Sequence, residues 1–322
     1  MATLKDVAKK ANVSVATASY VMNGSELITK PTKDKVMLAA KELGYRPNGN
    51  AKNLKKNKSN IIGFFLSGFT GPFFNELLEG IQRTVIKRGY EMVVCASDHK
   101  HRLLLEQYVD GAIILNYHIG DELLDSLAND KFPIVVLDRE LENPHINQIL
   151  LPNKLGMEQA VNHLVDQGHQ RIGFIAGSIE SFDGESRLEG FKESLAEKGL
   201  TLYDGDLIRA DFTEISGLLS MNKFLEENSD YPTAFVSAND EMAMGAIKAI
   251  QQKGRKVPED IALVGFDDID LARYAQPSLT TIRVQKKQWG QTAAETLFDM
   301  LENKEEFKEA EIPIEFIHRH SS

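Results

Sequence analysis

Residues 3–24 read TLKDVAKKANVSVATASYVMNG, and this stretch decides the fold of the N-terminal part of the chain. Thr3 precedes apolar residues at helical spacing, and Asp6 completes a capping box, which predicts a first helix that ends near Asn12. Ser14 can cap a second helix directly afterwards. Two short helices joined by a tight turn are typical of a helix-turn-helix unit.

Apolar residues at helical spacing also predict a third helix after the first two. The second helix stops at Asn23-Gly24, and its apolar positions are Val15, Ala18, Val21 and Met22. The third helix is predicted over residues 32–43, with Gly44 as its left-handed stop and a buried face formed by Val36, Ala39, Ala40 and Leu43. We therefore expect an all-helical domain over residues 1–46.

The second helix is the one that such units insert into the major groove of DNA. Its outward side carries Val15, Ala16 and Tyr20, which we expect to meet base edges. Small polar groups suited to phosphate oxygens come from Thr3, Ser14, Thr17, Ser19 and Asn23. An ordinary three-helix bundle is the alternative on spacing alone.

Charge is divided unevenly along the 322 residues. Residues 1–60 hold 12 Lys and Arg against 4 Asp and Glu, a net charge of +8, whereas the other 262 residues hold 25 against 43, a net charge of −18. A basic head indicates a polyanionic partner, which favours DNA binding over the ordinary bundle. No apolar run reaches the roughly 20 residues that span a bilayer, and Cys95 is the single cysteine, so we expect a reducing, cytoplasmic location.

The opening stretch, followed by LGYRPNGNAKNLKKNK at residues 43–58, closely resembles the head and hinge of the LacI/GalR family of bacterial transcriptional repressors. The resemblance implies a nucleoid-associated homodimer that binds operator DNA and is controlled by a small effector, which either releases the operator or strengthens its binding. It also assigns base contacts to Val15, Ala16 and Tyr20. Tyrosine stands where the family often has arginine, so the operator sequence cannot be taken from relatives.

Residues 47–59 form a basic segment that we interpret as a hinge. About nine residues there can be helical, fewer than the roughly 12 to 15 of a marginal isolated helix, so we predict a hinge that folds only on DNA. By resemblance Ala51 and Leu54 enter the minor groove, and Leu54 wedges a base step open. Neighbouring contacts are expected from Asn48, Lys52 and Lys55. A plain solvated linker is the alternative, and undiminished operator affinity of a Leu54→Ala protein would exclude the wedge.

Residues 60–322 contain an internal repeat at a spacing of 110. Ile62-Gly63-Phe64 recurs as Ile172-Gly173-Phe174, Leu78-Glu79-Gly80 recurs as Leu188-Glu189-Gly190, and Gly89 recurs as Gly199. Strands alternating with helices in each copy predict parallel sheets, and thus an α/β body of two Rossmann-like lobes of the periplasmic-binding-protein type I fold. The segment from Val94 to Ala112 is short, so we expect only a short helix in it.

Ligands of open parallel sheets bind beyond the carboxyl ends of the strands. Loops at those ends carry the candidate effector-binding residues Phe73, Phe74, Asp138, Arg139, Arg187, Phe212, Asn239, Asp240 and Asp267. Aromatic faces stack on sugar rings, and Asp, Asn and Arg bond to hydroxyls, so the set predicts a sugar site. Arg187 is the clearest cation among these loops, which favours a neutral sugar over a phosphosugar. A purine remains an alternative because phenylalanine also stacks on bases.

Several candidates have structural alternatives. Asp138 and Arg139 can form an internal ion pair, Phe74 can be part of the core, and Asp240 can cap the helix beginning at Glu241. His99 and His101 admit a metal site, although a solvated loop is the simpler interpretation, and we expect no metal and no cofactor.

Function classes other than an effector-controlled repressor are less well supported. No phosphate loop, GxSxG elbow, HExxH motif or cysteine–histidine pair is present, so we expect no catalytic residues and no enzyme. A solute-binding receptor would share the two-lobed body but not the basic head. A repressor controlled by a phosphocarrier protein would leave the cleft with little to bind.

Overall fold

In the computed structural model, residues 2–46, 58–97, 101–302 and 311–322 are described. The chain divides into a helical unit, Met1–Ser59, and an α/β unit, Asn60–Ser322. The predicted hinge contacts of Asn48, Ala51, Lys52, Leu54 and Lys55 lie outside the described residues, as does His99. Among the described residues, no helix has the length and apolarity needed to cross a membrane.

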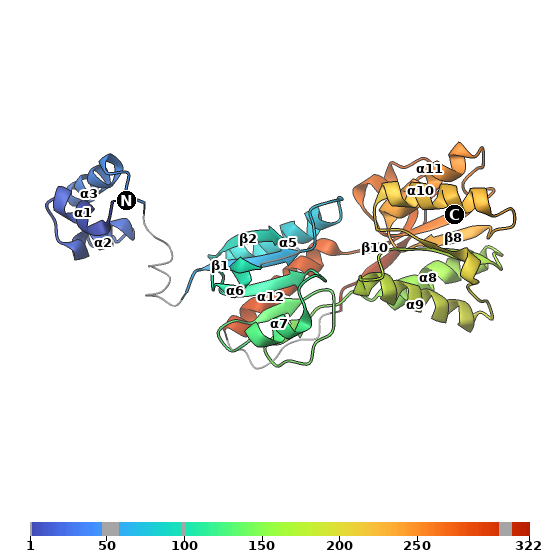
Figure 1. The fold of residues 1–322 in the computed structure, drawn as a ribbon, viewed down its shortest axis with the longest axis horizontal. Helices are drawn as coiled ribbons and strands as arrows, with labels where there is room; N and C mark the ends of the chain where they lie inside the picture. Colours follow the sequence, from blue (N-terminus) through green and yellow to red (C-terminus); the bar gives the residue numbers. More distant parts are fainter. Residues whose placement is uncertain (1, 47–57, 98–100, 303–310) are drawn as a thin grey trace. The chain divides into compact units, whose positions relative to one another are not determined.

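The helical unit consists of α1 (Leu4–Lys10), α2 (Val15–Met22) and α3 (Lys30–Glu42) (Figure 1). The predicted capping box at Thr3 and Asp6 is present, and the side chain of Ser14 accepts a hydrogen bond from Thr17 N at 3.0 Å. Helix α3 begins two residues earlier than predicted, because Pro31 occupies its first turn, where no backbone N–H is required.

The core of this unit is small and aliphatic. Val7, Ala18 and Val36 are fully buried, one from each helix. Val15 is 44% exposed, as expected for the outward side of α2, because Ala18 and Val21 fill the face that packs on α1 and α3. The outward side of α2 is therefore free for another molecule.

The first lobe of the α/β unit is a five-stranded sheet in which all neighbouring strands run parallel. Its order is β2 (Glu91–Ala96), β1 (Ile61–Leu66), β3 (Gly111–Leu115), β4 (Ile134–Val136) and β5 (Ile146–Gln148). Its helices are α5 (Phe74–Lys87), α6 (Arg102–Leu105), α7 (Asp121–Leu127) and α12 (Lys286–Leu301). Helix α6 is as short as the sequence predicted.

The second lobe is a six-stranded sheet that is parallel except for its last pair. Its order is β11 (Ile314–Ile317), β10 (Thr280–Val284), β9 (Ala262–Asp267), β8 (Ala234–Ser237), β6 (Ile172–Ala176) and β7 (Leu207–Arg209). Its helices are α8 (Asn153–Asp166), α9 (Phe182–Glu197), α10 (Glu214–Glu227) and α11 (Asp240–Gln252), with 3-10 turns η1 (Asp204–Asp206) and η2 (Asp270–Arg273).

The two copies of the repeat form equivalent parts of the two lobes. Ile62–Phe64 lies in β1 and Ile172–Phe174 in β6, while the Leu-Glu-Gly triplets lie in α5 and α9. Gly89 and Gly199 both have a positive φ, of 76° and 70°, directly after these helices. The prediction of two lobes with parallel sheets is confirmed.

The chain crosses between the lobes, so neither lobe is one continuous stretch of sequence. Helix α12 follows β10 of the second lobe but packs on α5 of the first, as Figure 1 shows with α12 in red beside the cyan α5. The indole N–H of Trp289 in α12 donates to the carbonyl of Ile149 at 2.7 Å, close to another crossing. Any movement of one lobe relative to the other must therefore change the conformation of these connecting segments.

Candidate functional site

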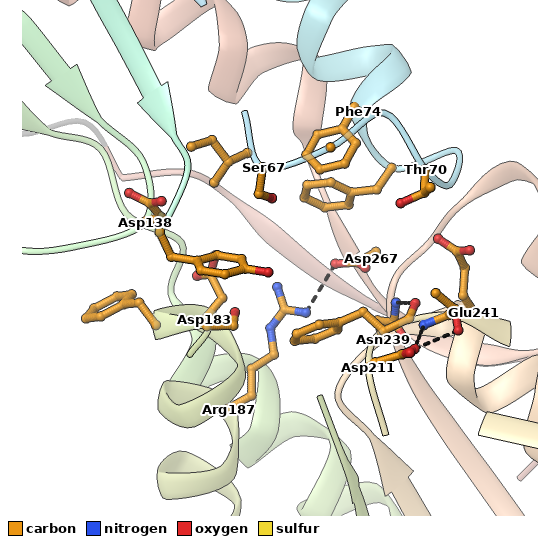
Figure 2. A pocket seen from close by; sticks show the side chains of 18 residues that line it. Ser67, Thr70, Phe74, Asp138, Asp183, Arg187, Asp211, Asn239, Glu241 and Asp267 are labelled. Carbon is orange, nitrogen blue, oxygen red and sulfur yellow. Dashed lines mark hydrogen bonds and ion pairs between the residues drawn. The ribbon is translucent and has the colours of Figure 1, made fainter. Parts of the chain in front are cut away.

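A cavity of about 270 Å³ lies where loops of the two lobes face each other (Figure 2). Each of these loops follows the carboxyl end of a parallel strand or begins the next helix, as the topology requires. The first lobe contributes Ser67, Gly68, Thr70, Phe73, Phe74, Leu115, Tyr117 and Asp138. The second lobe contributes Ser181, Phe182, Asp183, Arg187, Asp211, Phe212, Thr213, Asn239, Glu241 and Asp267.

Seven of the nine candidate effector-binding residues line this cavity: Phe73, Phe74, Asp138, Arg187, Phe212, Asn239 and Asp267. Arg139 does not line it. Its guanidinium bonds to the carboxylate of Asp138 at 3.0 Å and to the carbonyl of Ile119 at 2.6 Å, so it holds Asp138 in place from behind. This is the ion pair that the sequence offered as the alternative.

Asp240 also lies outside the lining. It is completely buried, accepts a hydrogen bond from Ile269 N at 2.8 Å, and accepts another from the hydroxyl of Thr281. The cap of α11 is Asn239, whose side chain accepts from Met242 N at 3.0 Å, and not Asp240. The rotation of α11 thus turns Asp240 into the lobe and brings Glu241 to the cavity.

Arg187 and Asp267 form the buried polar centre of the site. Arg187 Nη1 lies 3.4 Å from Asp267 Oδ1 and 2.6 Å from the carbonyl oxygen of Ala238, and the guanidinium lies 3.9 Å above the ring of Phe266. Asn153 accepts from Arg187 Nε at 2.9 Å. Burial raises the pKa of Asp267 to about 6, although Arg187 and Lys286 favour its charged form.

Aromatic rings form the apolar walls. Phe73 stands edge to face with Phe74 at 5.4 Å and contacts Trp289 at 6.3 Å between ring centroids. Across the cavity, the ring of Phe212 rests on Gly177, where an added Cβ would lie 2.1 Å from it. The glycine is required there because any larger residue would displace the ring.

Two lining residues have a strained backbone. Phe212 has a φ of 69° and Asp267 a φ of 109°, values that non-glycine residues seldom adopt and that cost about 1–3 kcal/mol each. The strained turn at Phe212 is held by Asn239, whose side-chain amide donates to the carbonyl of Phe212 at 2.9 Å. Strained positions that the surrounding structure maintains cluster at binding sites, which supports the assignment of this cavity.

Eight polar lining residues were not predicted, among them Tyr117, Asp183, Asp211 and Glu241. Tyr117 follows β3, so the strand-end rule that selected Asp138 could have found it. Asp183 lies one helical turn before Arg187, and Asp211 adjoins Phe212. Glu241 could not have been distinguished from Asp240, because only the packing of α11 decides which of them faces the cavity.

The lining carboxylates differ in their electrostatic surroundings. Burial raises the pKa of Asp138 and of Asp183. Burial also raises the pKa of Glu241, to about 7, with the charges of Asp267 and Glu214 adding to the effect. For Asp211, burial is outweighed by hydrogen bonds from Ser216 and Thr213, which lower its pKa.

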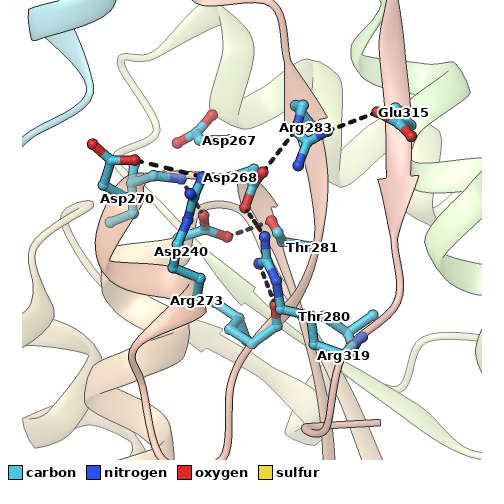
Figure 3. Close-up of polar contacts among 12 residues, drawn as sticks. Asp240, Asp267, Asp268, Asp270, Arg273, Thr280, Thr281, Arg283, Glu315 and Arg319 are labelled. Carbon is cyan, nitrogen blue, oxygen red and sulfur yellow. Dashed lines mark hydrogen bonds and ion pairs between the residues drawn. The ribbon is translucent and has the colours of Figure 1, made fainter.

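A charged cluster lies behind Asp267 (Figure 3). Asp268 accepts hydrogen bonds from Arg283 of β10 at 2.8 Å and from Arg319, just beyond β11, at 2.5 Å. The ammonium group of Lys286, at the start of α12, donates to the carbonyl of Asp267 at 2.6 Å. The backbone around Asp267 is therefore tied to the segments that cross between the lobes.

In the helical unit, the candidate DNA-binding residues Val15, Ala16 and Tyr20 are exposed on one side of α2, and Tyr20 is 55% exposed. Thr3, Ser14 and Asn23 are exposed as well, and Thr17 and Ser19 are partly exposed. Ser14 and Thr17 bond to each other at 2.8 Å, and Asn23 donates to the carbonyl of Ser19 at 2.8 Å. These contacts hold the polar groups in fixed positions around the exposed side of α2.

Two family models match the chain. Residues 3–48 match bacterial regulatory proteins of the lacI family, and residues 161–322 match the periplasmic binding protein-like domain. The chain is 36% identical over 312 residues to the HTH-type transcriptional repressor PurR of Aliivibrio salmonicida, covering 94% of this chain and 93% of the relative. It is 34% identical over 317 residues to the ribose operon repressor of Haemophilus influenzae, covering 95% and 94%.

Solved structures agree with these matches. A lac repressor dimer bound to operator and the anti-inducer ONPF superposes with a TM-score of 0.82 at 30% identity, covering 99% of this chain and 98% of that one. The transcriptional regulator CelR in complex with cellobiose has a TM-score of 0.74 at 29% identity, with full coverage of both chains. A regulator from Enterococcus faecium with bound ribose has a TM-score of 0.73 at 27% identity and covers 81% of this chain and 98% of that one.

Proposed function

This chain belongs to the lacI family of bacterial regulatory proteins, and from that premise we propose that its cavity holds an unphosphorylated sugar that controls operator binding. The chain is a transcriptional repressor with a DNA-binding head and an effector-binding body. It acts as a regulator and not as an enzyme, in the cytoplasm and on nucleoid DNA.

The composition of the cavity lining carries the proposal for the ligand. Aromatic rings on both sides can stack on a sugar ring, while carboxylate, amide and hydroxyl groups between them can bond to its hydroxyls. Arg187 is the only cation among the described lining residues, and five carboxylates accompany it. Those carboxylates would repel a phosphate group. The volume of about 270 Å³ lies just below the roughly 300–1,000 Å³ typical of ligand pockets and suits a small sugar.

The DNA-binding surface that we propose is the exposed side of α2, with Val15, Ala16 and Tyr20 toward base edges and the surrounding hydroxyl and amide groups toward phosphates. The protein works as a dimer, since two-fold symmetric operators require two heads. Leu271 and Tyr274 are 52% and 73% exposed beside Met244 and Ile247. This apolar surface suits contact between the two bodies.

Ligand binding by the full-length protein tests the proposal. Titration calorimetry with a panel of unphosphorylated sugars, their phosphate esters and purine bases should give heat with at least one unphosphorylated sugar. Trp289, the single tryptophan of the chain, contacts Phe73 and should report the same event by fluorescence. Exclusive binding of a phosphosugar or a purine, or binding of a phosphocarrier protein without any sugar, would contradict the sugar assignment.

The coupling to DNA requires a second measurement. An operator is first selected from random duplexes with the full-length protein, and its affinity is then compared with and without the sugar identified by calorimetry. Allosteric coupling of about 1–3 kcal/mol corresponds to a change of roughly 5- to 150-fold. If the operator affinity were the same with and without the sugar, the sugar would bind to the protein without controlling repression.

A further inference from the structure

The cavity is lined by more carboxylates than cations, and most of these carboxylates already form ion pairs or hydrogen bonds within the protein. Asp138 pairs with Arg139 at 3.0 Å, Asp183 accepts from Asn153 at 2.7 Å, and Asp211 accepts from Thr213. Asp267 faces Arg187, whose other hydrogen bonds go to neutral groups. These four carboxylates therefore have partners within the protein.

Glu241 differs from the other four because no described residue donates a hydrogen bond to its carboxylate or pairs with it. It is partly buried at the start of α11, in the second lobe. Its carboxylate reaches the first lobe, since an added Cβ on Gly71 would lie 2.3 Å from Glu241 Oε1. Figure 2 shows the Glu241 carboxylate beside Thr70. The unpaired carboxylate of Glu241 thus extends from the second lobe to the loop of the first lobe at the opening of the cavity.

The groups that face Glu241 do not neutralise it. From the second lobe, Asp267 and Glu214 face it and disfavour its charge, and Glu214 is already paired with Lys248. From the first lobe, the loop over residues 67–73 contains no charged residue. Two buried cations lie nearby: Lys286 donates to the carbonyl of Asp267, and Arg187 faces the Asp267 carboxylate. The opening therefore retains uncompensated negative charge.

A second acceptor points into the same cavity. Asp267 is 4% exposed, and its Oδ1 atom has no hydrogen-bond donor within the described part of the chain, although Arg187 lies 3.4 Å away. A buried acceptor without a donor destabilises the ligand-free protein, so a ligand that supplies a donor recovers that free energy. Two unsatisfied acceptors of the second lobe, on Glu241 and Asp267, therefore call for a ligand rich in donors.

We propose that the effector is a sugar bearing a protonated amine, and that Glu241 receives its ammonium group while Asp267 accepts from a neighbouring hydroxyl. This inference rests on the proposed sugar site. A neutral sugar can donate hydrogen bonds to Glu241 but leaves its charge uncompensated in a partly dehydrated cleft. An ammonium group donates hydrogen bonds and also compensates the charge. A cleft lined by one sign of charge also concentrates ligands of the opposite sign. The raised pKa of Glu241 agrees with a carboxylate that lacks its cation.

Matched ligands test the proposal. D-Glucosamine, D-galactosamine and D-mannosamine are titrated into the full-length protein, each beside its parent hexose and its N-acetyl derivative, which lacks the charge. We expect at least one amino sugar to bind about tenfold or more tightly than both of its neutral counterparts, as a charge-assisted hydrogen bond predicts.

Variants identify the residue that is responsible. Glu241→Gln keeps the size of the side chain but removes its charge, so the amino sugar should no longer bind more tightly than its parent hexose and its N-acetyl derivative. Glu214→Gln is the matched control: it removes a carboxylate that acts on Glu241 but does not line the cavity, so the amine preference should persist. Thermal unfolding of both variants confirms that each is folded.

Proton release gives an independent measurement. At about pH 6, Glu241 with a pKa of about 7 is mostly protonated, and it must lose its proton to pair with an ammonium group. Calorimetry in buffers of different ionisation enthalpy should therefore show that the parent protein releases close to one proton more than Glu241→Gln when the amino sugar binds.

The outcomes separate the two proposals. Equal binding of an amino sugar and its parent hexose, or an amine preference that survives in Glu241→Gln, would overturn the amine assignment and leave the sugar site standing. Binding of no sugar from a broad panel, charged or neutral, would overturn the sugar site itself.

Discussion

Arg187 Nη1 lies 3.4 Å from Oδ1 of Asp267, and both side chains are almost completely buried. Asp267 also has a strained backbone and a carbonyl that accepts from Lys286. The lining of the cavity and the crossing at α12 therefore meet at one residue. A ligand that changes the position of Asp267 acts directly on a connection between the lobes.

Replacement of Arg187 by Met should destabilise the protein, because it leaves the Asp267 carboxylate buried without its cation. Breaking a buried ion pair costs about 3–5 kcal/mol, which urea denaturation can measure. The double variant Arg187→Met with Asp267→Asn should recover part of that loss, since neither charge remains. Strictly additive losses in the double-mutant cycle would show that the two side chains do not interact.

Stability should depend on pH through Glu241. Its pKa in the folded protein is raised to about 7, above its ordinary value of 4.5, so folding favours the protonated form. Stability from this group is full at low pH and is lost as the pH rises from about 4.5 through 7. Ligand-free Glu241→Gln should therefore gain thermal stability relative to the parent at pH 8, and that gain should shrink toward pH 5. A constant difference across this range would show that Glu241 does not titrate as its burial requires.

Asp268 should have the opposite dependence on pH. Although burial opposes it, Arg319 and Arg283 lower its pKa below 3.8, so its stabilising contribution is present at neutral pH and is lost as the pH falls through the lowered value. Asparagine tolerates its φ of 48°, so Asp268→Asn removes the charge without new strain. We expect a loss of about 1.5–3 kcal/mol at pH 7 in urea denaturation and a smaller loss near pH 3.

Gly80→Ala should disrupt the packing of α5 on α12. An added Cβ would lie 2.1 Å from the carbonyl oxygen of Lys287, and backbone at that distance cannot simply rotate away. We expect a loss of about 1–3 kcal/mol or more by chemical denaturation. Gly205→Ala is the control, because Gly205 is exposed, has no atom within 4 Å of an added Cβ, and should change stability by less than about 0.5 kcal/mol.

Tyr20→Ala should alter DNA recognition without unfolding the head. Tyr20 is 55% exposed on α2, so its truncation removes little buried contact. On operators with single base-pair changes, the variant should lose discrimination of about 1–3 kcal/mol at one position. Leu38→Ala, an exposed residue of α3, is the control and should keep the parent preference. An unchanged preference in Tyr20→Ala would exclude a base contact by this residue.

Local patterns predicted much of this protein. The capping box at Thr3, the cap at Ser14 and the stop at Gly44 depend on hydrogen bonds and backbone angles within a few residues, so their sequences suffice to predict them. The repeat at a spacing of 110 predicted the two lobes, because each copy contains a complete strand and helix. Seven of the nine residues that the strand-end rule selected line the cavity.

Other features depend on packing between distant segments. The sequence placed Asp240 and Glu241 side by side, and only the docking of α11 on β8 and β9 turned the first toward Thr281 and the second toward the cavity. Arg139 was predicted to contact the ligand, but in the structure its guanidinium donates a hydrogen bond to the carbonyl of Ile119, a contact that depends on the fold.

A basic helix-turn-helix head, a body of two parallel α/β lobes and the loops that form the cavity could all be predicted from the amino-acid sequence. The return of α12 to the first lobe and the position of the unpaired Glu241 opposite Gly71 became visible only in the folded chain. The physical reason is that helix caps and strand periodicity are satisfied within a short segment. The partner of a charge, in contrast, is whichever group close packing brings next to it from elsewhere in the chain.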